Sequence, residues 1–595
     1  MTITFPLPSS QISPFALVLH LAPVLLVAWI LNALFIRPFS DPLRLLPGPA
    51  RSFFSSSLQD ILDPGVSNNA YTGWRRQFGR TFKFHGFGWQ DYRLMTFDVK
   101  AMSHIMNAPT YERPWQTRSF LSRLLGKGIF TNEGPTHLRQ RTILHIAFRN
   151  LSIEDLEPAF FNKAEALADR WTEALSLRSD SDEICCRSVN ESQKDSAVID
   201  VGEWMSRASF DAMGLASFNF DFRTIQNESE DVYDAYRQRL AVMDKGVGIW
   251  GTLNSYLPII RNTAITRDIR IMNTSLRTID TTVKSIVAQT KAAMKGVSAE
   301  QDLFASLIES NLSVGQSDRL ADATLLEQCS TLLLTGSDTV SVALSWCLHF
   351  LANYPEVQAR LRDELYDSTS CEVDDMSDTS SDSGYEEHCV SCKAKTMQMA
   401  MQMAMPYKCS CHLKGARWKA VSNLRYLDSV VRETLRLCPP IQNIVRVATC
   451  DDTIPLFFPV SLANGTTRRQ DTGYIPIRKG SYVHIPIDGL NQCEDIWGPD
   501  AAEFRPSRWE TATLPSLPSV DYPLSFGMGN HHSCLGHRLA LAHIKIFLAT
   551  LLPRFEFNPA EGIEISKFGS TLTRPYVQGK WSDGSQLPLR VRKLQ

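Results

Sequence analysis

The feature that most constrains this chain is a glycine-rich turn that holds one cysteine and leads into a helix with an apolar face, SFGMGNHHSCLGHRLALAHIKIFLATLL at 525–552. The residues that share the apolar face are Leu539, Ala542, Ile546 and Ala549. Cys534 stands at the start of this predicted helix, where the helix dipole favours an anion and is expected to lower the thiol pKa. Gly527, Gly529 and Gly536 would let the backbone approach a flat cofactor closely. The turn is therefore suited to hold a metal thiolate.

A second stretch with unusual polar residues is LLLTGSDTVSVALSW at 332–346, inside the apolar helical pattern of 323–351. Gly336 in a helix interior costs about 1 kcal/mol relative to Ala. Asp338 and Thr339 cost more if they are buried without hydrogen bonds. A polar notch that faces solvent and a functional site are both compatible with this pattern.

The chain as a whole is predicted to be mainly α with small β-sheets. Helical spacing recurs at 323–351, 353–366, 424–437 and 536–552, whereas strand-like alternation is short, as in YIPI at 474–477 and YVHIPI at 482–487. With 44% apolar residues the chain can bury a large core. Its formal net charge of -2 provides no basic footprint, so a nucleic-acid partner is not expected.

The turn around Cys534 resembles the haem-binding loop of the cytochrome P450 superfamily. The companions that carry the resemblance are EGPTHLRQRTILHIAF at 133–148, LLLTGSDTVSVALSW at 332–346, VRETLRLCPP at 431–440 and IWGPDAAEFRPSRW at 496–509. The resemblance extends from about Leu43 to the C-terminus, apart from two polar stretches, and is strongest with fungal microsomal members. It implies the cytochrome P450 fold preceded by an N-terminal transmembrane helix.

The resemblance implies an iron ligand and a catalytic pair. Cys534 would be the axial thiolate ligand of the iron of haem b, iron protoporphyrin IX. The helix at 323–351 is similar to the one that passes over the haem where O2 binds. Thr339 is expected to hydrogen-bond the oxygen there, and Asp338 is expected to supply protons for cleavage of the O–O bond.

The resemblance also implies cofactor-binding residues around the haem. The residues expected to contact its propionates are His137, Arg141, Arg446 and His532, because cations satisfy carboxylates in a dry site. Phe526, Gly529 and Gly536 complete the expected cofactor-binding residues in the turn. His137 stands where many members carry Trp. For any one of these cations, a solvated surface position is the alternative.

A cluster of three charged residues is expected to support the haem loop. Glu433 and Arg436 are three residues apart on a predicted helix and so lie on one face. By resemblance, Arg508 completes the cluster, whose role in the family is structural. We therefore assign these residues to the scaffold and not to catalysis.

The loop departs from the family pattern by one extra residue. Asn530, His531, His532 and Ser533 stand between Gly529 and Cys534, where members usually have three residues. This leaves open which of the two histidines contacts the haem. A histidine could replace the cysteine as iron ligand, as in globins, but only Cys534 has the expected helix behind it.

The N-terminal stretch 14–36 contains no formally charged side chain, and as a helix it would span about 34 Å against a hydrocarbon core of about 30 Å. No Lys or Arg precedes the run, which favours a retained anchor over a secretory signal peptide. Arg37, Arg44 and Arg51 follow it, so the positive-inside tendency places the rest of the chain in the cytosol. We expect a single-pass anchor in the endoplasmic reticulum membrane at 1–36, a proline-rich hinge at 37–49 and a haem-thiolate domain at 50–595.

Two polar stretches, 176–198 and 367–415, interrupt the helical pattern and are predicted to be surface insertions. The potential zinc ligands in the second are His388, Cys389, Cys392, Cys409, Cys411 and His412. Its Ser/Asp-rich and Met-rich flanks favour a disordered loop over a metal knuckle. Cys329, Cys347 and Cys438 lie in apolar helical patterns and are predicted to be buried structural thiols.

The expected reaction is a monooxygenation that inserts one atom of O2 into an apolar small molecule. The chain has no GxGxxG after a strand, so electrons from NADPH are expected to arrive through a separate flavoprotein reductase. The resemblance places the substrate pocket around Trp115–Ile129, 240–262, Gln442–Val445 and Leu572–Arg574. A terpenoid or other specialised metabolite is the expected substrate. The alternatives are a haem-thiolate isomerase or dehydratase, which tends to lack the acid–alcohol pair, and a non-catalytic haem protein.

Overall fold

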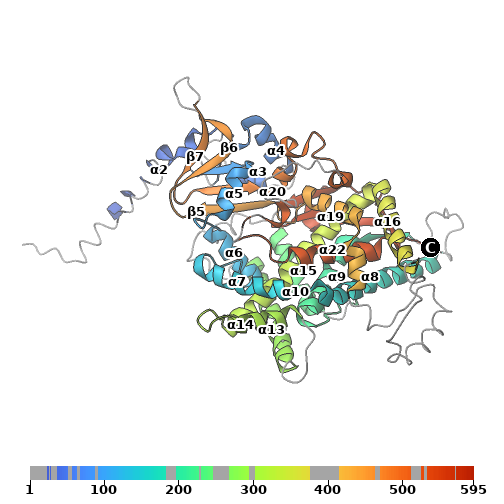
Figure 1. Cartoon of the computed structure of the whole chain (residues 1–595). Coiled ribbons are helices and arrows are strands. Elements are labelled where there is room, and N and C mark those ends of the chain that lie inside the picture. The colour runs from blue at the N-terminus through green and yellow to red at the C-terminus, as the bar shows by residue number, and fades with distance from the viewer. Residues whose placement is uncertain are drawn as a thin grey trace, which may run out of the picture. The chain divides into compact units, whose positions relative to one another are not determined.

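The computed structural model describes residues 23–25, 27–28, 32, 36–50, 57–62, 67–86, 91–182, 196–226, 230–244, 267–293, 302–374, 415–462, 470–510, 524–527, 529, 532–569 and 571–594. These residues form a mainly helical protein with small sheets, as predicted (Figure 1). The chain divides into two compact units. One comprises Met1–Ile105 and Val445–Ile485, and the other comprises Met106–Ile444 and Pro486–Gln595.

The first unit contains all or most of six of the twelve strands found in the described residues. Its helices are α2 (Arg37–Ser40), η2 (Pro42–Leu45), α3 (Ser57–Leu62), α4 (Ser67–Phe78) and most of α5 (Val99–Asn107). Its strands are β1 (Thr81–His85), β2 (Tyr92–Thr96), most of β5 (Asn443–Ala448), β6 (Asp452–Leu462), β7 (Gln470–Ile477) and most of β8 (Tyr482–Pro486). Strand β2 pairs with β1 in antiparallel register and with β8 in parallel register. The predicted strands at 474–477 and 482–487 are confirmed as parts of β7 and β8.

The predicted hinge at 37–49 packs against the first sheet. Leu43 and Leu46 are buried, and the Lys83 amide in β1 donates to the Pro47 carbonyl. A side chain at Gly48 would collide with the Lys83 carbonyl, which explains the glycine between two prolines. The described part of this segment is therefore anchored to the unit that follows it.

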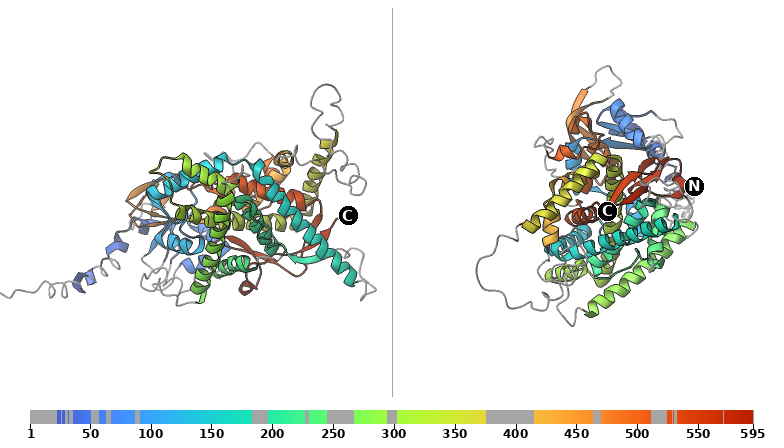
Figure 2. Two further views of the ribbon diagram at one scale, coloured as in Figure 1. Left: turned by 90° about the horizontal axis from the view of Figure 1, so that it is seen from below. Right: turned by 90° about the vertical axis from the view of Figure 1, so that its right-hand side faces the viewer.

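The second unit contains the long helices, which Figure 2 shows from two further directions. They are α6 (Trp115–Leu125), α7 (Gly134–Asn150), α8 (Ile153–Asp182), α9 (Val201–Phe218), α10 (Glu230–Asp244), α13 (Arg267–Ala293), α14 (Leu303–Ser313), α15 (Asp322–Asn353), α16 (Pro355–Asp374), α18 (Ala416–Ser422), α19 (Arg425–Leu437) and α22 (His537–Leu551). The predicted helices at 323–351, 353–366, 424–437 and 536–552 correspond to α15, α16, α19 and α22. Each of these four predictions is confirmed.

Helix α15 runs through the core of the second unit and packs against α9, α13, α19 and α22. Of the helices in the described residues, it alone is long and apolar enough to cross a membrane, and 78% of its most apolar stretch is buried inside the protein. Burial explains its composition, because a helix that is apolar all round needs partners on every side. The predicted span at 14–36 lies largely outside the described residues.

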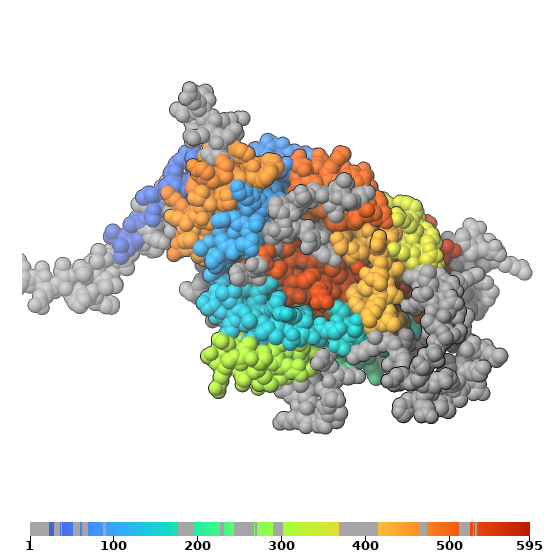
Figure 3. All heavy atoms as spheres, in the orientation of Figure 1, coloured from blue at the N-terminus to red at the C-terminus, as the bar shows by residue number. Residues whose placement is uncertain are grey.

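Short elements complete the second unit. They are β3 (Tyr111–Glu112), β4 (Ser196–Asp200), α20 (Ile487–Asn491), α21 (Glu494–Trp497), η4 (Pro506–Trp509), η5 (Leu524–Phe526), β9 (Phe555–Pro559), β10 (Ile565–Gly569), β11 (Thr573–Val577), η6 (Trp581–Asp583) and β12 (Pro588–Lys593). One sheet has the strand order β4-β12-β9, and β10 pairs with β11. In the space-filling view, red atoms of the C-terminal segments of this unit reach the surface beside cyan atoms of its N-terminal helices (Figure 3).

The two predicted surface insertions stay a prediction, and the structure shows helix or strand at three of their edges. The first polar stretch begins inside α8, which continues to Asp182, and ends inside β4, which pairs with β12. The second begins inside α16, which continues to Asp374. Polarity was misleading here because a helix end and an edge strand tolerate polar side chains on their exposed faces. The interiors, 183–195 and 375–414, and the potential zinc ligands lie outside the described residues.

Candidate active site

The loop before α22 is closed by a hydrogen bond from the Cys534 amide to the Phe526 carbonyl, at 2.8 Å. The Gly527 amide donates to the Leu524 carbonyl, also at 2.8 Å. Gly527 and Gly529 have φ values of 75° and 88°, in the left-handed region that favours glycine. The loop thus turns back on itself and presents Cys534 just before the first turn of α22.

The glycines serve this turn and its packing. A side chain at Gly529 would meet the Met106 carbonyl at 2.9 Å, whereas one at Gly536 would meet only the Phe148 ring, at 3.5 Å. The expectation that these three glycines allow close approach to a cofactor stays a prediction. Gly527 and Gly529 are required by backbone conformation, and Gly529 also by a neighbouring backbone.

The Cys534 thiol is accessible although it lies deep in the second unit. Burial raises the pKa of the thiol, while a hydrogen bond from the Gly536 amide and the positive charge of Arg141 act to lower it. The sequence predicted a lowered pKa from the helix start. This expectation is wrong for the thiol without a bound metal. Burial raises its pKa by more than the Gly536 amide and the Arg141 charge lower it.

Arg141 on α7 binds the loop directly beside the cysteine. Its Nη2 donates to the Ser533 carbonyl at 2.9 Å and to Ser533 Oγ at 3.0 Å. The sequence assigned Arg141 to a haem propionate. In the structure the guanidinium positions the residue that precedes Cys534.

A largely buried cluster of polar and charged side chains lies next to this contact. The His137 and His532 rings are 5.0 Å apart, and His532 Nε2 is 3.8 Å from the Glu133 carboxylate. Arg113 Nη1 donates to the same carboxylate at 3.0 Å. Sequence reasoning missed Arg113 and Glu133. The available signal was that Glu133 opens the motif around His137, but no local pattern links it to a residue twenty positions earlier.

One face of buried α15 remains partly accessible, and it carries Leu332, Thr335 and Thr339. Thr339 Oγ1 donates to the Thr335 carbonyl at 2.7 Å, the local bond that a helical threonine commonly makes. A side chain at Gly336 would meet the flexible end of Met213 on α9, with Cε at 2.5 Å. Helix α9 therefore packs closely against α15 at this glycine.

Asp338 is held by an arginine from a distant strand. Arg574 Nη2 in β11 donates to both carboxylate oxygens, at 2.7 and 2.6 Å, and both side chains are buried. The sequence placed Arg574 only in the substrate pocket. The polar residue in the apolar helix is therefore satisfied by an ion pair and does not face a solvated notch.

The structure brings Glu433, Arg436 and Arg508 together in a fully buried cluster. Arg436 Nε donates to Glu433 at 2.8 Å, and Arg508 Nε donates to it at 3.0 Å. Trp509 Nε1 donates to the same carboxylate at 3.0 Å, and Asp500 binds Arg508. The last two residues were not foreseen.

Hydrogen bonds connect this cluster to the cysteine loop. Arg436 Nη1 donates to the Asn491 carbonyl at 2.7 Å, and Asn491 Nδ2 donates to Ser525 Oγ at 3.2 Å. Ser525 Oγ in turn donates to the Leu435 carbonyl at 2.5 Å. Since Ser525 precedes Phe526, which closes the loop, the cluster supports the loop through the backbone.

Comparison with known proteins identifies the family. The sequence model of the cytochrome P450 family matches residues 47–379 and 411–581. Cytochrome P450 monooxygenase 128 of Postia placenta is 30% identical over 96% of this chain and 96% of its own length. Cytochrome P450 monooxygenase claQ of Ampulloclitocybe clavipes is 29% identical over 99% of this chain and 100% of its own length.

The chain belongs to the cytochrome P450 family. Members of this family are monooxygenases that bind haem iron and use a redox partner, O2 and an organic substrate. The resemblance to fungal members is confirmed by these relatives.

The remaining site residues of this P450 are distributed over both units. Arg446 belongs to the first unit, where it is buried and donates to the Val445 carbonyl at 3.0 Å. His531 and much of the stretch 240–262 lie outside the described residues. Within the described residues, no group of three or more His, Cys, Asp or Glu side chains could hold a metal ion.

The predicted structural cysteines are confirmed as buried free thiols. They are Cys329, Cys347 and Cys438. Burial raises the pKa of Cys347 and Cys438 to about 12, so both stay protonated and inert.

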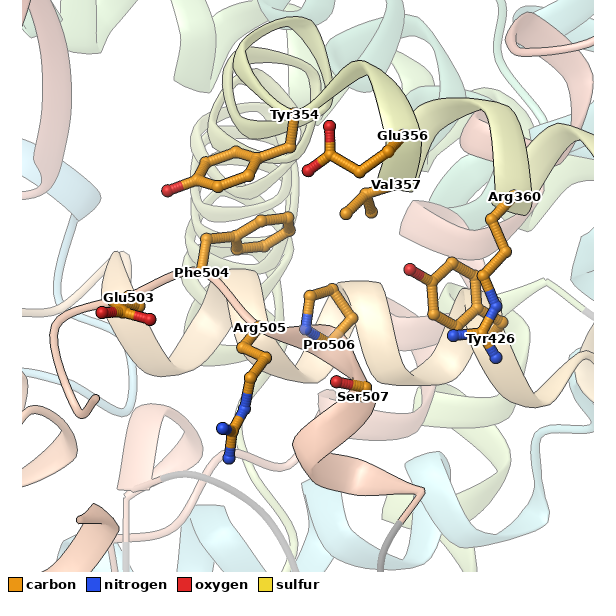
Figure 4. A pocket seen from close by; sticks show the side chains of 10 residues that line it. All are labelled: Tyr354, Glu356, Val357, Arg360, Tyr426, Glu503, Phe504, Arg505, Pro506 and Ser507. Carbon is orange, nitrogen blue, oxygen red and sulfur yellow. The ribbon is translucent and has the colours of Figure 1, made fainter. Parts of the chain in front are cut away.

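A surface pocket of this P450 lies elsewhere in the second unit, between the start of α16, α19 and η4 (Figure 4). Figure 4 shows aromatic and charged side chains around it, including Tyr354, Phe504 and Arg505. The Arg360 guanidinium lies over the Tyr426 ring, 3.8 Å from its centroid. None of the ten lining residues belongs to the predicted active site, so this pocket is not a candidate for it.

Proposed function

We propose that this P450 is a membrane-anchored monooxygenase that inserts one atom of O2 into an apolar small molecule, with Cys534 as the axial ligand of haem b. The observation that carries the proposal is the accessible Cys534 thiol deep in the second unit, held at the start of α22 by the Phe526 and Ser533 contacts. A lone thiolate with backbone and cationic donors nearby suits a haem iron, which takes its other ligands from the macrocycle.

When bound, haem would supply the iron centre that binds and activates O2. The protein's own contribution would be to position groups and to move protons. Thr339 stands on the accessible face of α15, and its hydroxyl can turn from the Thr335 carbonyl to a ligand. Asp338 would supply protons, and Arg574 sets the position of its carboxylate. Proton delivery by Asp338 therefore requires exchange within this ion pair.

His137, Arg141, His532 and Arg446 would bind the haem propionates, and Phe526, Gly529 and Gly536 would shape the cysteine loop. Arg141 and His532 lie within hydrogen-bonded or charged groups beside Cys534. The cluster of Glu433, Arg436 and Arg508 would keep the loop in place, since it binds the backbone on either side of α20 and α21.

Membrane attachment through residues 1–36 is supported by exposed apolar side chains at the end of the span and elsewhere in the first unit. In the first unit, Ile36 and Phe39 are 63% and 56% exposed, and Phe457 at the β6–β7 hairpin is 70% exposed. Such side chains suit a lipid interface better than water. We propose a single pass in the endoplasmic reticulum membrane, a short segment at 37–49 and a catalytic domain at 50–595 that faces the cytosol.

Electrons would come from NADPH through a separate flavoprotein reductase, and the substrate would be a terpenoid or other specialised metabolite. Product identification by mass spectrometry after co-expression with a reductase tests both points. We expect an oxygenated product only with the reductase present. Turnover without it would indicate an isomerase or dehydratase, and turnover of small polar compounds alone would contradict the substrate class.

The ligand assignment is tested with the carbon-monoxide complex of the reduced protein. The wild type and the Cys450→Ser control, which changes an exposed free thiol, are expected to give the red-shifted Soret band of a thiolate complex. Cys534→Ser is expected to lose that band. A Cys534→Ser variant that kept it would contradict the assignment.

The role of Thr339 is tested by the coupling of NADPH consumption to product formation. Thr339→Ala is expected to lower the product formed per NADPH consumed by roughly tenfold or more, because a positioned proton-transfer group contributes about a hundredfold to a rate. Ser345→Ala is the control, since Ser345 is a buried hydroxyl on the same helix that binds the Ser341 carbonyl. Full coupling in Thr339→Ala would contradict the assignment.

A further inference from the structure

A buried arginine on α10 has more hydrogen-bond donors than partners. Arg239 is 1% exposed, and its Nη2 donates to the Arg123 carbonyl at the end of α6, at 3.0 Å. Its Nε and Nη1 are buried and have no hydrogen-bond partner among the described residues. A buried donor without a partner costs about 1–3 kcal/mol, and more when it is charged. Such a side chain persists where another role needs it.

The charge of Arg239 is only weakly compensated. Burial lowers the pKa of the guanidinium to about 10, and Asp280 on α13 is the one charge that acts to raise it. Asp280 accepts a hydrogen bond from Ser330 Oγ on α15 at 3.0 Å and forms no ion pair with Arg239 in the described residues. The site therefore retains a net positive charge in an apolar setting that includes Leu124, Ile129 and Leu240.

A second unpartnered donor lies on α15, which contacts the segment that follows α6. Gln328 on α15 is fully buried, and its Oε1 accepts from the Ile129 amide at 3.0 Å. Its Nε2 has no partner within the described residues. Thr331 Oγ1 also donates to the Leu125 carbonyl at 2.9 Å. Hydrogen bonds thus connect the end of α6 to α15 and to α10. Arg239 on α10 and Gln328 on α15 each keep N–H donors without a partner in the described residues.

The periodicity of α15 connects this site to the active site. Gln328, Leu332, Thr335 and Thr339 recur at helical spacing and share one face of α15. Eleven residues of helix rise about 16 Å from Gln328 to Thr339. A ligand that binds at Gln328 and extends along this face would reach Thr339 with its far end.

We propose that Arg239, with Gln328, binds the carboxylate of an elongated apolar acid and so determines which carbon is presented at Thr339. The planar guanidinium fork matches a carboxylate with two parallel hydrogen bonds, and the amide of Gln328 adds a neutral donor. A single cation among apolar side chains suits a monoanion with a hydrocarbon body. The donors are enclosed, so the acid reaches them by displacing the side chains that cover them. The proposal rests on the proposed monooxygenase function and specifies its substrate class.

Binding to the full-length haem protein tests the proposal. The probes are dodecanoic acid and methyl dodecanoate, with octanoic and hexadecanoic acid to vary the length, and affinity is measured by calorimetry. Dodecanoic acid is expected to bind at least about tenfold more tightly than its ester, equivalent to about 1.4 kcal/mol. Arg239→Met is expected to remove this difference, because it changes the affinity for the acid and leaves that for the ester.

Three further variants separate recognition from a structural role. Arg239→Lys is expected to restore part of the acid affinity, since it keeps the charge and loses the fork. Gln328→Leu is expected to weaken the acid severalfold. Arg237→Met changes a neighbouring arginine on α10 that binds Glu203 at 2.5 Å, and is expected to change neither affinity. The wild type and all four variants are first checked for the thiolate carbon-monoxide spectrum.

The outcomes of the two proposals are distinguishable. Equal binding of acid and ester, equal weakening of both by Arg239→Met, or no binding of any probe overturns the carboxylate site while the thiolate spectrum persists. Failure of Arg239→Met to fold, together with unchanged acid preference in Arg239→Lys and Gln328→Leu, overturns it as well. Absence of the thiolate spectrum in the wild type overturns the proposed function instead.

Discussion

Two buried arginines of the second unit, Arg436 and Arg239, differ in how their donors are used. Arg436 is 0% exposed and uses all five donors that a guanidinium has, on Glu433 and on the carbonyls of Asn491, Ala501 and Glu503. Arg239 is 1% exposed and makes one hydrogen bond within the described part of the chain, to the Arg123 carbonyl. The two side chains are equally buried, but within this part of the chain the donors of Arg436 are all used and most of those of Arg239 are not.

We interpret this difference as one of role: Arg436 is structural, whereas Arg239 has donors left for a ligand. A fully bonded buried charge holds segments together, and removing it leaves its partners unsatisfied. A buried charge with open donors destabilises the fold, and its removal should cost little. Variants of buried arginines and of one partner of Glu433, taken from the largest to the smallest expected loss of stability, test this difference.

The largest effect is expected for Arg436→Lys. A lysine cannot reproduce the two bonds to Glu433 or the three to carbonyls, so the buried carboxylate loses its main partner. We expect a loss of about 3–5 kcal/mol in the free energy of unfolding, with loss of the thiolate spectrum. Arg505→Lys, which changes an arginine with a side chain 53% exposed that binds Asp500, is the control for chemical unfolding. Wild-type stability in Arg436→Lys would contradict the structural role of the cluster.

An intermediate effect is expected for Arg574→Met. It leaves the buried Asp338 carboxylate without its cation, which costs about 3 kcal/mol, the lower end of the range for breaking a buried ion pair. Thermal unfolding measures the loss, and Arg574→Lys is the control because it keeps a positive charge. If Arg574→Met and Arg574→Lys lower the stability equally, Arg574 stabilises the fold through its shape and not through charge pairing.

A smaller effect is expected for Trp509→Phe. The ring is kept, but one hydrogen bond to Glu433 is lost while Arg436 and Arg508 still bind the carboxylate. The expected loss is about 1 kcal/mol in chemical unfolding. A loss as large as that of Arg436→Lys would mean that the cluster fails as a unit and that its bonds cannot be ranked singly.

The smallest effect on stability is expected for Arg239→Met. The pKa of Arg239 is lowered in the folded state, so the charged form is less favourable there than in the unfolded chain at every pH below about 10. Removing the charge should leave the free energy of unfolding unchanged or raise it, as measured by chemical unfolding at neutral pH. A loss of more than about 2 kcal/mol in the free energy of unfolding would mean that Arg239 has a structural role like that of Arg436.

Much of the site could be predicted because its signals are local. Apolar spacing located α15, α19 and α22, and the glycines before Cys534 predicted a turn that ends at a helix start. The three-residue spacing of Glu433 and Arg436 placed both on one face of α19. Polarity misled at the edges of α8 and α16, where helices continue into polar sequence.

The sequence by itself determined the family, the main helices and the cysteine that suits a haem iron, because motifs and periodicity depend on neighbours along the chain. Tertiary structure alone decided that Asp338 pairs with Arg574, 236 residues away, and that burial raises the pKa of Cys534. It also decided that Arg436 is saturated while Arg239 is not. Hydrogen-bond satisfaction and desolvation depend on which distant elements pack together, and no local pattern records that.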